Sequence, residues 1–247
     1  MISLKNITKN YGSTTVISNL HLEVAKSETL VLLGSSGCGK TTTLKMINRL
    51  ISFDDGDILI DGKSIMDVNP IQLRRNIGYV FQNIGLLPHF TVKENLCIVP
   101  KLLKWEKEKM ERQLEKVCDT MHIEKAFLKR RPKQLSGGQR QRVGVGRALM
   151  GDPDIVLMDE PFGALDPITR ESIQDEFSSL KALINKTIVF VTHDIHEAFT
   201  VADRICIMEQ GLIEQVGTKR EMLENPASDF VERFMHRHRK SLEKELE

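Results

Sequence analysis

Residues 34–41, GSSGCGKT, combine glycines with a lysine and a threonine at the spacing G-x-x-x-x-G-K-[ST]. Glycines let a loop backbone curl so that successive N–H groups face one anion. The pattern therefore predicts nucleotide binding, with the Lys40 ammonium on the β- and γ-phosphates and the Thr41 hydroxyl on Mg²⁺. The candidate binding residues of this phosphate loop are Gly34, Ser35, Ser36, Gly37, Cys38, Gly39, Lys40, Thr41 and Thr42.

Two acidic residues, Asp159 and Glu160, follow an apolar run at 155–158. Mg²⁺ prefers octahedral oxygen ligands and keeps several waters, so we expect Asp159 to hold the metal or one of its waters. Glu160 points elsewhere and is the candidate general base for in-line attack of water on the γ-phosphorus. An Asp-Glu pair is also common at loop starts in α/β proteins, and the phosphate loop favours the catalytic interpretation.

A third motif, LSGGQ at 135–139, has the capping-box spacing between Ser136 and Gln139 and predicts a helix over 140–150. Gly137 and Gly138 leave the helix start open to a second anion. Neither this motif nor the phosphate loop is duplicated in the sequence. One nucleotide can touch both only if they lie close or belong to different copies, and we expect a head-to-tail pair in which each LSGGQ serves the partner's nucleotide.

Apolar runs separated by polar or glycine-rich residues predict the elements that position these motifs. Runs that are apolar throughout suit central strands covered on both faces, and their alternation with helical patterns is typical of a doubly wound α/β sheet. Segments 204–210 and 212–216 flank Gly211 and predict a hairpin. The other predicted strands are 2–5, 16–24, 29–33, 77–81, 155–158 and 187–192.

The stretch 91–150 is expected to be mostly helical and to form a subdomain inserted into the α/β core. Within it, apolar positions 110, 114, 117, 118 and 121 have the spacing of one helix face. Residues 221–247 also have a helical pattern. We expect one domain over 1–235 and a charged tail over 236–247.

The composition is that of a globular chain with a sizeable core. Of 247 residues, 40% are hydrophobic and 28% charged, which excludes collagenous, disulfide-stapled and wholly disordered classes. The net charge of +1 gives no argument for a nucleic-acid partner. No apolar run approaches the roughly 20 residues of a membrane span, the N-terminus lacks a signal peptide, and the four cysteines form no CxxC pair. We expect the chain to stay inside the cell.

In the order and spacing of GSSGCGKTT, LSGGQ and MDEP, residues 1–235 resemble the ATP-binding-cassette (ABC) ATPases. The resemblance implies a P-loop NTPase core with an N-terminal antiparallel β subdomain and an inserted helical subdomain. It also implies ATP hydrolysis with Mg²⁺. By the same resemblance, Gln82 contacts Mg²⁺ or the attacking water, Asp166 lines the dimer seam, His193 contacts the γ-phosphate and Tyr11 stacks on adenine.

Four segments, 45–50, 74–82, 84–89 and 158–167, are most similar to the ATPases of quaternary-amine osmoprotectant importers, which take up glycine betaine, choline, carnitine or proline betaine. This resemblance implies membrane permease subunits, a separate solute-binding protein and a peripheral place on the cytoplasmic side of the inner membrane. Three alternatives stay open: an importer for another small solute such as an amino acid or a phosphonate, a non-transport ABC ATPase, and a P-loop module without turnover.

Some features of the sequence depart from the family pattern, and other residues have two interpretations. Longer members carry C-terminal regulatory repeats, and we expect no second folded domain after Met235. Gly146 stands where the family usually has Ala, and we expect slight loosening of the helix. Lys40 and a helix start beside Cys38 favour a lowered thiol pKa and a reactive thiol, and the alternative is that Cys38 is a small filler at an unconstrained position. Ile84, Leu86, Leu87 and Phe90 are expected to line a permease groove or to pack in the core.

Overall fold

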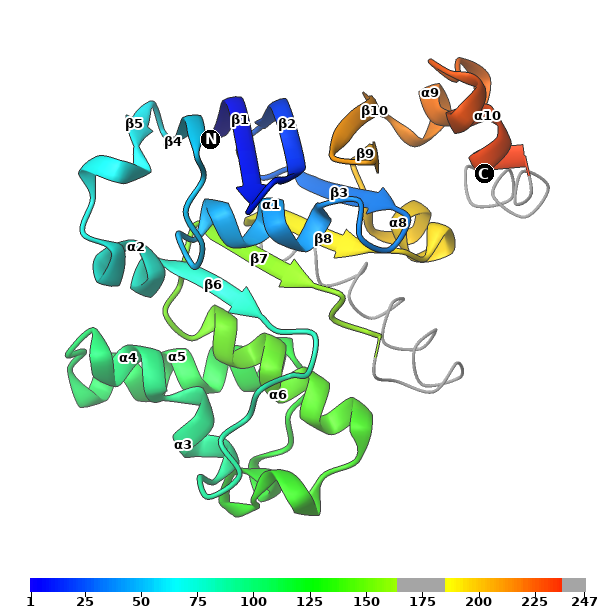
Figure 1. The fold of residues 1–247 in the computed structure, drawn as a ribbon. Helices are drawn as coiled ribbons and strands as arrows, with labels where there is room; N and C mark the ends of the chain where they lie inside the picture. Colours follow the sequence, from blue (N-terminus) through cyan, green and yellow to red (C-terminus); the bar gives the residue numbers. More distant parts are fainter. Residues whose placement is uncertain (164–184, 237–247) are drawn as a thin grey trace. The chain divides into compact units, whose positions relative to one another are not determined.

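The computed structural model describes residues 1–163 and 185–236 (Figure 1). Contacts divide the chain into two compact units. Unit 1 comprises Met1–Leu73 and Lys186–Glu247, and unit 2 comprises Arg74–Asn185. The predicted tail lies outside the described residues beyond His236.

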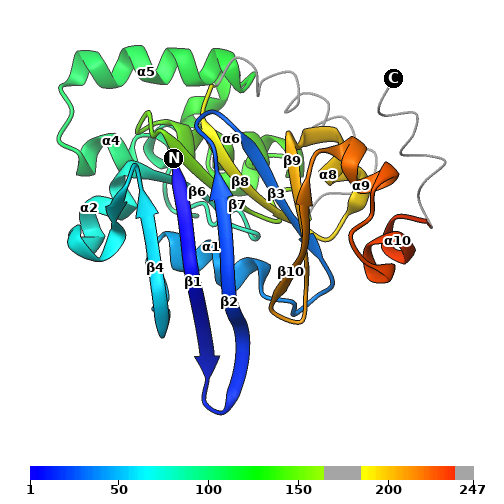
Figure 2. The same cartoon turned by 90° about the horizontal axis from the view of Figure 1, so that it is seen from above.

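An antiparallel sheet in unit 1 begins the chain. Its strand order is β2-β1-β4-β5, and Figure 2 shows β4, β1 and β2 side by side. Leu4 pairs with Leu22 on one side and Ile58 on the other, and all three are buried, so one face of the sheet enters the core. The bounds are β1 Ile2–Tyr11, β2 Thr14–Val24, β4 Asp55–Ile60 and β5 Lys63–Ser64.

The first strand is longer than the sequence predicted. Apolar alternation in β1 breaks at Asn6, which has a φ of 53°, and the predicted strand stopped at residue 5. Pairing with β2 nevertheless resumes after register shifts and continues to Tyr11, opposite Thr14. Cross-strand hydrogen bonds therefore extend the strand past the irregularity.

A second set of strands in unit 1 has β3 (Thr29–Gly34) between β8 (Thr187–Thr192) and β9 (Arg204–Glu209), all parallel. Strand β10 (Leu212–Gly217) pairs antiparallel with β9, which confirms the hairpin across Gly211. Every residue of β3 is buried. That is the burial predicted for a continuous apolar run.

The helices of unit 1 follow these strands. They are α1 Lys40–Ile47, α8 Ile195–Val201, α9 Lys219–Glu224 and α10 Asp229–His236, with a short 3-10 turn at Ile65–Asp67. The chain passes into unit 2 within α2 (Pro70–Asn76).

The helical pattern predicted from residue 221 is interrupted, because α9 ends at Glu224 and α10 begins at Asp229. Pro226 disfavours a helical conformation of the residue before it, Asn225. The Gln215 side chain stabilises the break, donating to the Asn225 carbonyl (3.0 Å) and accepting from the Ala227 N–H (2.8 Å).

Unit 2 combines two parallel strands, β6 (Ile77–Val80) and β7 (Ile155–Asp159), with helices. Helix α5 buries Leu114, Val117 and Cys118, the face that the apolar spacing predicted. The helices are α3 Val92–Leu96, α4 Ile98–Leu102, α5 Lys107–Thr120 and α6 Gly137–Leu149, with 3-10 turns at Lys125–Lys129 and Pro132–Gln134. Among the described residues of both units, none of the helices has the length and apolar character of a bilayer span.

Gly146 lies at a close approach between helices in unit 2. A Cβ there would be 3.2 Å from Leu96 of α3 and 3.2 Å from Val117 of α5. The expectation that Gly146 loosens the helix took only helix propensity into account. The structure shows that the missing side chain lets α6 pack tightly against its neighbours.

Candidate nucleotide-binding and hydrolysis site

The phosphate loop in unit 1 joins β3 to α1, and its shape is set by glycines. A Cβ on Gly34 would collide with the Met208 carbonyl oxygen of β9. Gly39 has a φ of 107°, and a Cβ there would collide with the Ile17 side chain of β2. Gly37 is also left-handed, at 83°, but faces open space. The loop backbone is therefore held against two strands while its middle stays open to a ligand.

The Lys40 side chain is folded into this loop and is 5% exposed. Its ammonium donates to the carbonyl oxygens of Gly34 (2.9 Å) and Ser35 (2.8 Å). The Thr43 hydroxyl donates to the Gly39 carbonyl (3.1 Å), which joins the loop to the first turn of α1. A positive charge thus lies within a ring of loop backbone, which is suitable for an incoming phosphate.

The polar edge of the loop includes a contact that the sequence did not reveal. The Ser35 hydroxyl donates to the Glu209 carboxylate of β9 (2.7 Å). Ser36 is exposed, and Thr41 and Thr42 are half-buried. No local pattern links Ser35 to a residue 174 positions away, so only the sheet register could identify this pair.

The expectation of a lowered pKa for Cys38 is wrong. The side chain is 3% exposed, and its burial raises the pKa of the thiol more than the Lys40 charge lowers it. The lysine ammonium lies 3.7 Å from the sulfur. Cys38 fills space beneath the loop, as the alternative interpretation held.

His193 is exposed and follows the last residue of β8, Thr192. The Thr192 hydroxyl accepts from the Asp194 N–H (3.0 Å), and the Asp194 carboxylate accepts from the His196 N–H (2.9 Å). These bonds fix the turn that starts α8 and direct His193 away from the core.

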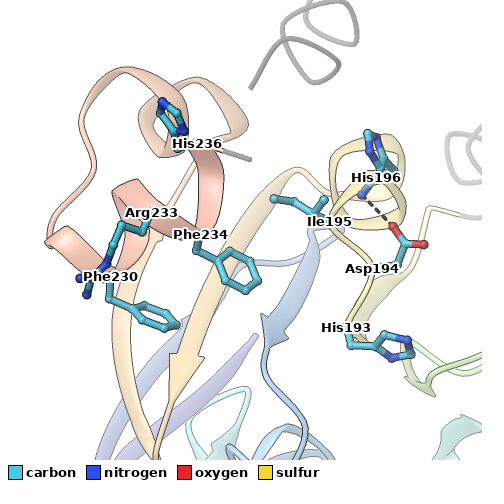
Figure 3. A pocket seen from close by; sticks show the side chains of 8 residues that line it. All are labelled: His193, Asp194, Ile195, His196, Phe230, Arg233, Phe234 and His236. Carbon is cyan, nitrogen blue, oxygen red and sulfur yellow. Dashed lines mark hydrogen bonds between the residues drawn. The ribbon is translucent and has the colours of Figure 1, made fainter. Parts of the chain in front are cut away.

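A cavity of about 760 Å³ opens beside His193 within unit 1. Figure 3 shows the β8–α8 turn on one side and the aromatic side chains of α10 on the other. The lining residues are His193, Asp194, Ile195, His196, Phe230, Arg233, Phe234 and His236.

Tyr11, at the end of β1, is 51% exposed. The Lys9 ammonium lies 5.3 Å from the centre of its ring. An exposed ring can stack on a planar ligand, and the adenine contact of Tyr11 stays a prediction.

The candidate catalytic residues of unit 2 lie at the carboxyl ends of two parallel strands, Gln82 after β6 and Asp159 and Glu160 at the end of β7. Val80 pairs with Met158, so Gln82 and Glu160 each come two residues past the paired positions. The Gln82 side-chain amide donates to the Glu160 carboxylate (3.0 Å). Asp159 is 5% exposed and accepts from the Tyr79 hydroxyl (3.4 Å).

Tyr79 was missed by sequence reasoning. Burial raises the pKa of its hydroxyl, and the neighbouring Asp159 charge raises it further. A neutral donor therefore faces the carboxylate at all ordinary pH values. The sequence offered one sign of this role, because Tyr79 carries the only polar side-chain group in the strand Ile77–Val80.

The LSGGQ segment of unit 2 forms the predicted capping box. The Ser136 hydroxyl accepts from the Gln139 N–H (3.2 Å), and the Gln139 side chain accepts from the Ser136 N–H (2.9 Å). Ser136 is exposed at the start of α6. Gly137 is half-buried and Gly138 is buried.

The candidate residues therefore divide between the units. Unit 1 carries Tyr11, the phosphate loop and His193, and unit 2 carries Gln82, Asp159, Glu160 and Ser136–Gln139. Asp166 lies outside the described residues. The proposed Mg²⁺ ligands Thr41, Gln82 and Asp159 offer a hydroxyl, an amide and a carboxylate, which are the oxygen donors this ion prefers. Among the described residues, no three or more His, Cys, Asp or Glu side chains form a group that could hold a metal ion.

A glycine-rich loop between a buried parallel strand and a helix defines an α/β protein of the P-loop class. The family model described as "ABC transporter" matches residues 17–163. The solved dimeric structure of MJ0796, a bacterial ABC transporter cassette, has a TM-score of 0.77 and 35% identity, covering 88% of this chain and 98% of that one. The chain belongs to the ABC transporter family and has the fold of its ATPase cassettes.

Two curated relatives are similar over nearly the whole chain. The glycine betaine/carnitine/choline transport ATP-binding protein OpuCA of Bacillus subtilis is 52% identical over 97% of this chain and 63% of its own length. The glycine betaine uptake system ATP-binding protein YehX of Escherichia coli is 44% identical over 96% of this chain and 77% of its own length. The chain thus spans less than two thirds of the Bacillus protein.

Proposed function

We propose that this chain is the ATP-binding and ATP-hydrolysing part of an ABC importer for a quaternary-amine osmoprotectant such as glycine betaine, choline or carnitine. The observation that carries ATP binding is the phosphate loop, with Lys40 held inside it and Gly34 and Gly39 packed against neighbouring strands. The proposed cargo is inferred from the names of the similar transport proteins.

Nucleotide binding would use the residues of unit 1. The Lys40 ammonium would exchange its carbonyl partners for the β- and γ-phosphates, while loop N–H groups bind the remaining oxygens. Tyr11 would stack on the adenine ring. His193, exposed after β8, would contact the γ-phosphate.

Hydrolysis would use the residues of unit 2. Phosphoryl transfer depends mainly on positioning and on stabilising charge, and bound Mg²⁺ would supply part of that charge stabilisation. Glu160 would accept a proton from the attacking water, with its carboxylate oriented by Gln82 (3.0 Å). A general base contributes about 10²–10⁴-fold to such a reaction. Asp159, with Thr41 and Gln82, would hold the metal or its waters.

The partner at the nucleotide would be a second copy, arranged head to tail. Ser136, Gly137, Gly138 and Gln139 of each copy would complete the partner's site, and Asp166 would line the seam. The start of α6 supports this role, because Ser136 is exposed there and a helix N-terminus favours an anion. The similar MJ0796 cassette has been solved as a dimer.

Mixed complexes test this arrangement. Ser136→Arg and Lys40→Ala should each inactivate the protein when present in both copies. If sites are shared head to tail, a mixed dimer places both lesions in one site and leaves the other intact, so mixing should restore part of the ATPase activity. Mixing that restores no activity, although mass spectrometry detects mixed dimers, would contradict shared sites.

The remaining partners would be membrane permease subunits and, through them, a solute-binding protein, with this chain peripheral on the cytoplasmic side of the inner membrane. Closure of the ATP-bound dimer would move the permease, and hydrolysis would reopen it. The net charge of +1 gives no reason to add a nucleic acid.

Solute-dependent ATPase activity tests the proposal as a whole. The protein, reconstituted in vesicles with its permease and binding protein, should hydrolyse Mg-ATP faster with glycine betaine, choline or carnitine present. Glu160→Gln is the matched control, since it should keep ATP binding and lose hydrolysis. Stimulation by an amino acid or a phosphonate instead would favour the alternative cargo, and no ATP hydrolysis under any condition would disprove the proposal.

A further inference from the structure

Two consecutive residues shortly after Gln82 have left-handed backbone. Ile84 has a φ of 56° and Gly85 a φ of 61°. Glycine adopts this conformation freely, whereas a β-branched residue such as isoleucine almost never does. Ile84 is nevertheless buried, with its N–H bonded to the Phe81 carbonyl (2.9 Å). The surrounding structure must therefore hold this turn in place.

One side chain binds both residues of this turn. The Arg147 guanidinium donates to the Ile84 carbonyl (2.8 Å) and to the Gly85 carbonyl (2.6 Å). Arg147 is 9% exposed, and the burial lowers the pKa of its guanidinium without removing the charge. Charged donors form strong bonds in such surroundings, and the two-pronged geometry fixes the turn in one orientation.

The same helix contacts the turn from a second position. Gly144 lies one turn before Arg147 on α6, and a Cβ on Gly144 would be 2.7 Å from the Ile84 Cγ2 atom. The isoleucine side chain therefore packs on bare helix backbone. Of the two sequence expectations for Ile84, packing in the core is the one that the structure shows, because the side chain is buried within unit 2.

We propose that Arg147 and Gly144 are positioning residues that hold the strained Ile84–Gly85 turn and thereby keep Gln82 against Glu160. This inference rests on the proposed function, in which Gln82 and Glu160 act on the attacking water. The turn begins two residues after Gln82, so its release would let the amide leave the carboxylate, 3.0 Å away. Helix α6 also starts directly after its N-cap Ser136, so one helix joins the LSGGQ segment to the turn that follows Gln82.

Arg147→Gln tests the guanidinium contact. The variant should lower kcat for ATP about 10- to 100-fold and leave KM for ATP within about twofold, because it misplaces a catalytic group without touching the phosphate loop. Arg147→Lys should restore only part of the rate, since an ammonium cannot bind both carbonyls in the same planar geometry. Arg112→Gln, an exposed arginine on α5, is the matched control and should keep the original kcat.

Amide hydrogen exchange supplies a readout that does not depend on turnover. In Arg147→Gln the N–H of Ile84 should exchange faster, whereas the paired N–H groups of β6 and β7 should not change. A variant with unchanged exchange at Ile84 and unchanged kcat would overturn the proposal. Failure of the unmodified protein to hydrolyse ATP would instead count against the proposed function, and the exchange result would still decide whether the turn is held.

Gly144→Ala and Gly146→Ala form a matched pair on α6. Both add one methyl group, but only the first meets Ile84. Gly144→Ala should lower kcat at least fivefold, and Gly146→Ala should keep it within about twofold. Adding Ile84→Ala to Gly144→Ala removes the colliding Cγ2 and should return kcat to that of Ile84→Ala alone. Equal effects of the two glycine variants, or no rescue by Ile84→Ala, would contradict the proposed contact.

Discussion

The phosphate loop of unit 1 and the segment that follows Gln82 in unit 2 are both irregular, but they are held in different ways. In the phosphate loop, backbone packs against other strands because glycines leave no side chain in between, as at Gly34 and Gly39. After Gln82, side chains from helices hold the backbone by hydrogen bonds, Arg147 donating to two carbonyls and Asn95 accepting from the Leu87 N–H. The first arrangement favours one conformation, whereas the second can be released by breaking two hydrogen bonds.

The largest expected effect comes from adding a methyl group to the phosphate loop. Gly39→Ala should weaken ATP binding about 100-fold, because two costs add in the bound loop. Left-handed backbone strain costs about 1–3 kcal/mol, and overpacking of the new methyl group against Ile17 costs a similar amount. Gly37→Ala should weaken ATP binding only about tenfold, since the backbone there is left-handed but the new methyl group would enter open space. Titration with a fluorescent ATP analogue measures both dissociation constants.

A double variant separates strain from collision in the same loop. Ile17→Val removes the terminal methyl group that a Cβ at position 39 would meet. Added to Gly39→Ala, it should bring ATP affinity close to that of Gly37→Ala, because only the backbone strain then remains. If Gly39→Ala binds ATP as well as the unmodified protein, the loop is not held by close packing.

Local patterns were sufficient to predict the elements whose structure is decided by neighbouring residues. The capping box of Ser136 and Gln139 is confirmed because both partners lie within four residues of each other. The buried strand β3 is confirmed as well, since continuous apolar sequence suits a strand covered on both faces. In these elements, the interactions that decide the structure are close in sequence.

The sequence failed where distant groups decide the outcome. The raised pKa of Cys38 depends on burial by the whole fold, and the break before Asp229 depends on Gln215, ten or more residues earlier. The same holds for Ile84, whose burial depends on a glycine 60 positions away. Each is a long-range contact that composition and periodicity do not encode.

A smaller effect is expected from the segment held by side chains. Asn95 is fully buried, and its amide group binds Leu87 (2.8 and 3.1 Å), Phe90 (3.3 Å) and Thr91 (3.0 Å). Asn95→Ala should lower the free energy of unfolding by about 1–3 kcal/mol, because several backbone groups lose their partner at once. Urea denaturation measures the change.

The matched control for this segment is Asn83→Ala, an exposed asparagine in the same stretch of chain, which should change the free energy of unfolding by less than about 0.5 kcal/mol. Asn95→Ala should also leave ATP affinity unchanged, since the phosphate loop is held by its own backbone contacts. A loss of ATP affinity without a loss of stability would mean that the two regions are not held independently.

The smallest effect concerns the reactivity of Cys38. Maleimide reacts with the thiolate, and burial raises the pKa of this thiol, so labelling at pH 7 should be slow and should rise with pH. Ser36→Cys places a thiol at an exposed position of the same loop and should label at least tenfold faster, as followed by mass spectrometry of the loop peptide. Equal labelling rates at the two positions would show that the loop opens readily, and the contrast between a backbone-packed loop and a side-chain-held turn would then fail.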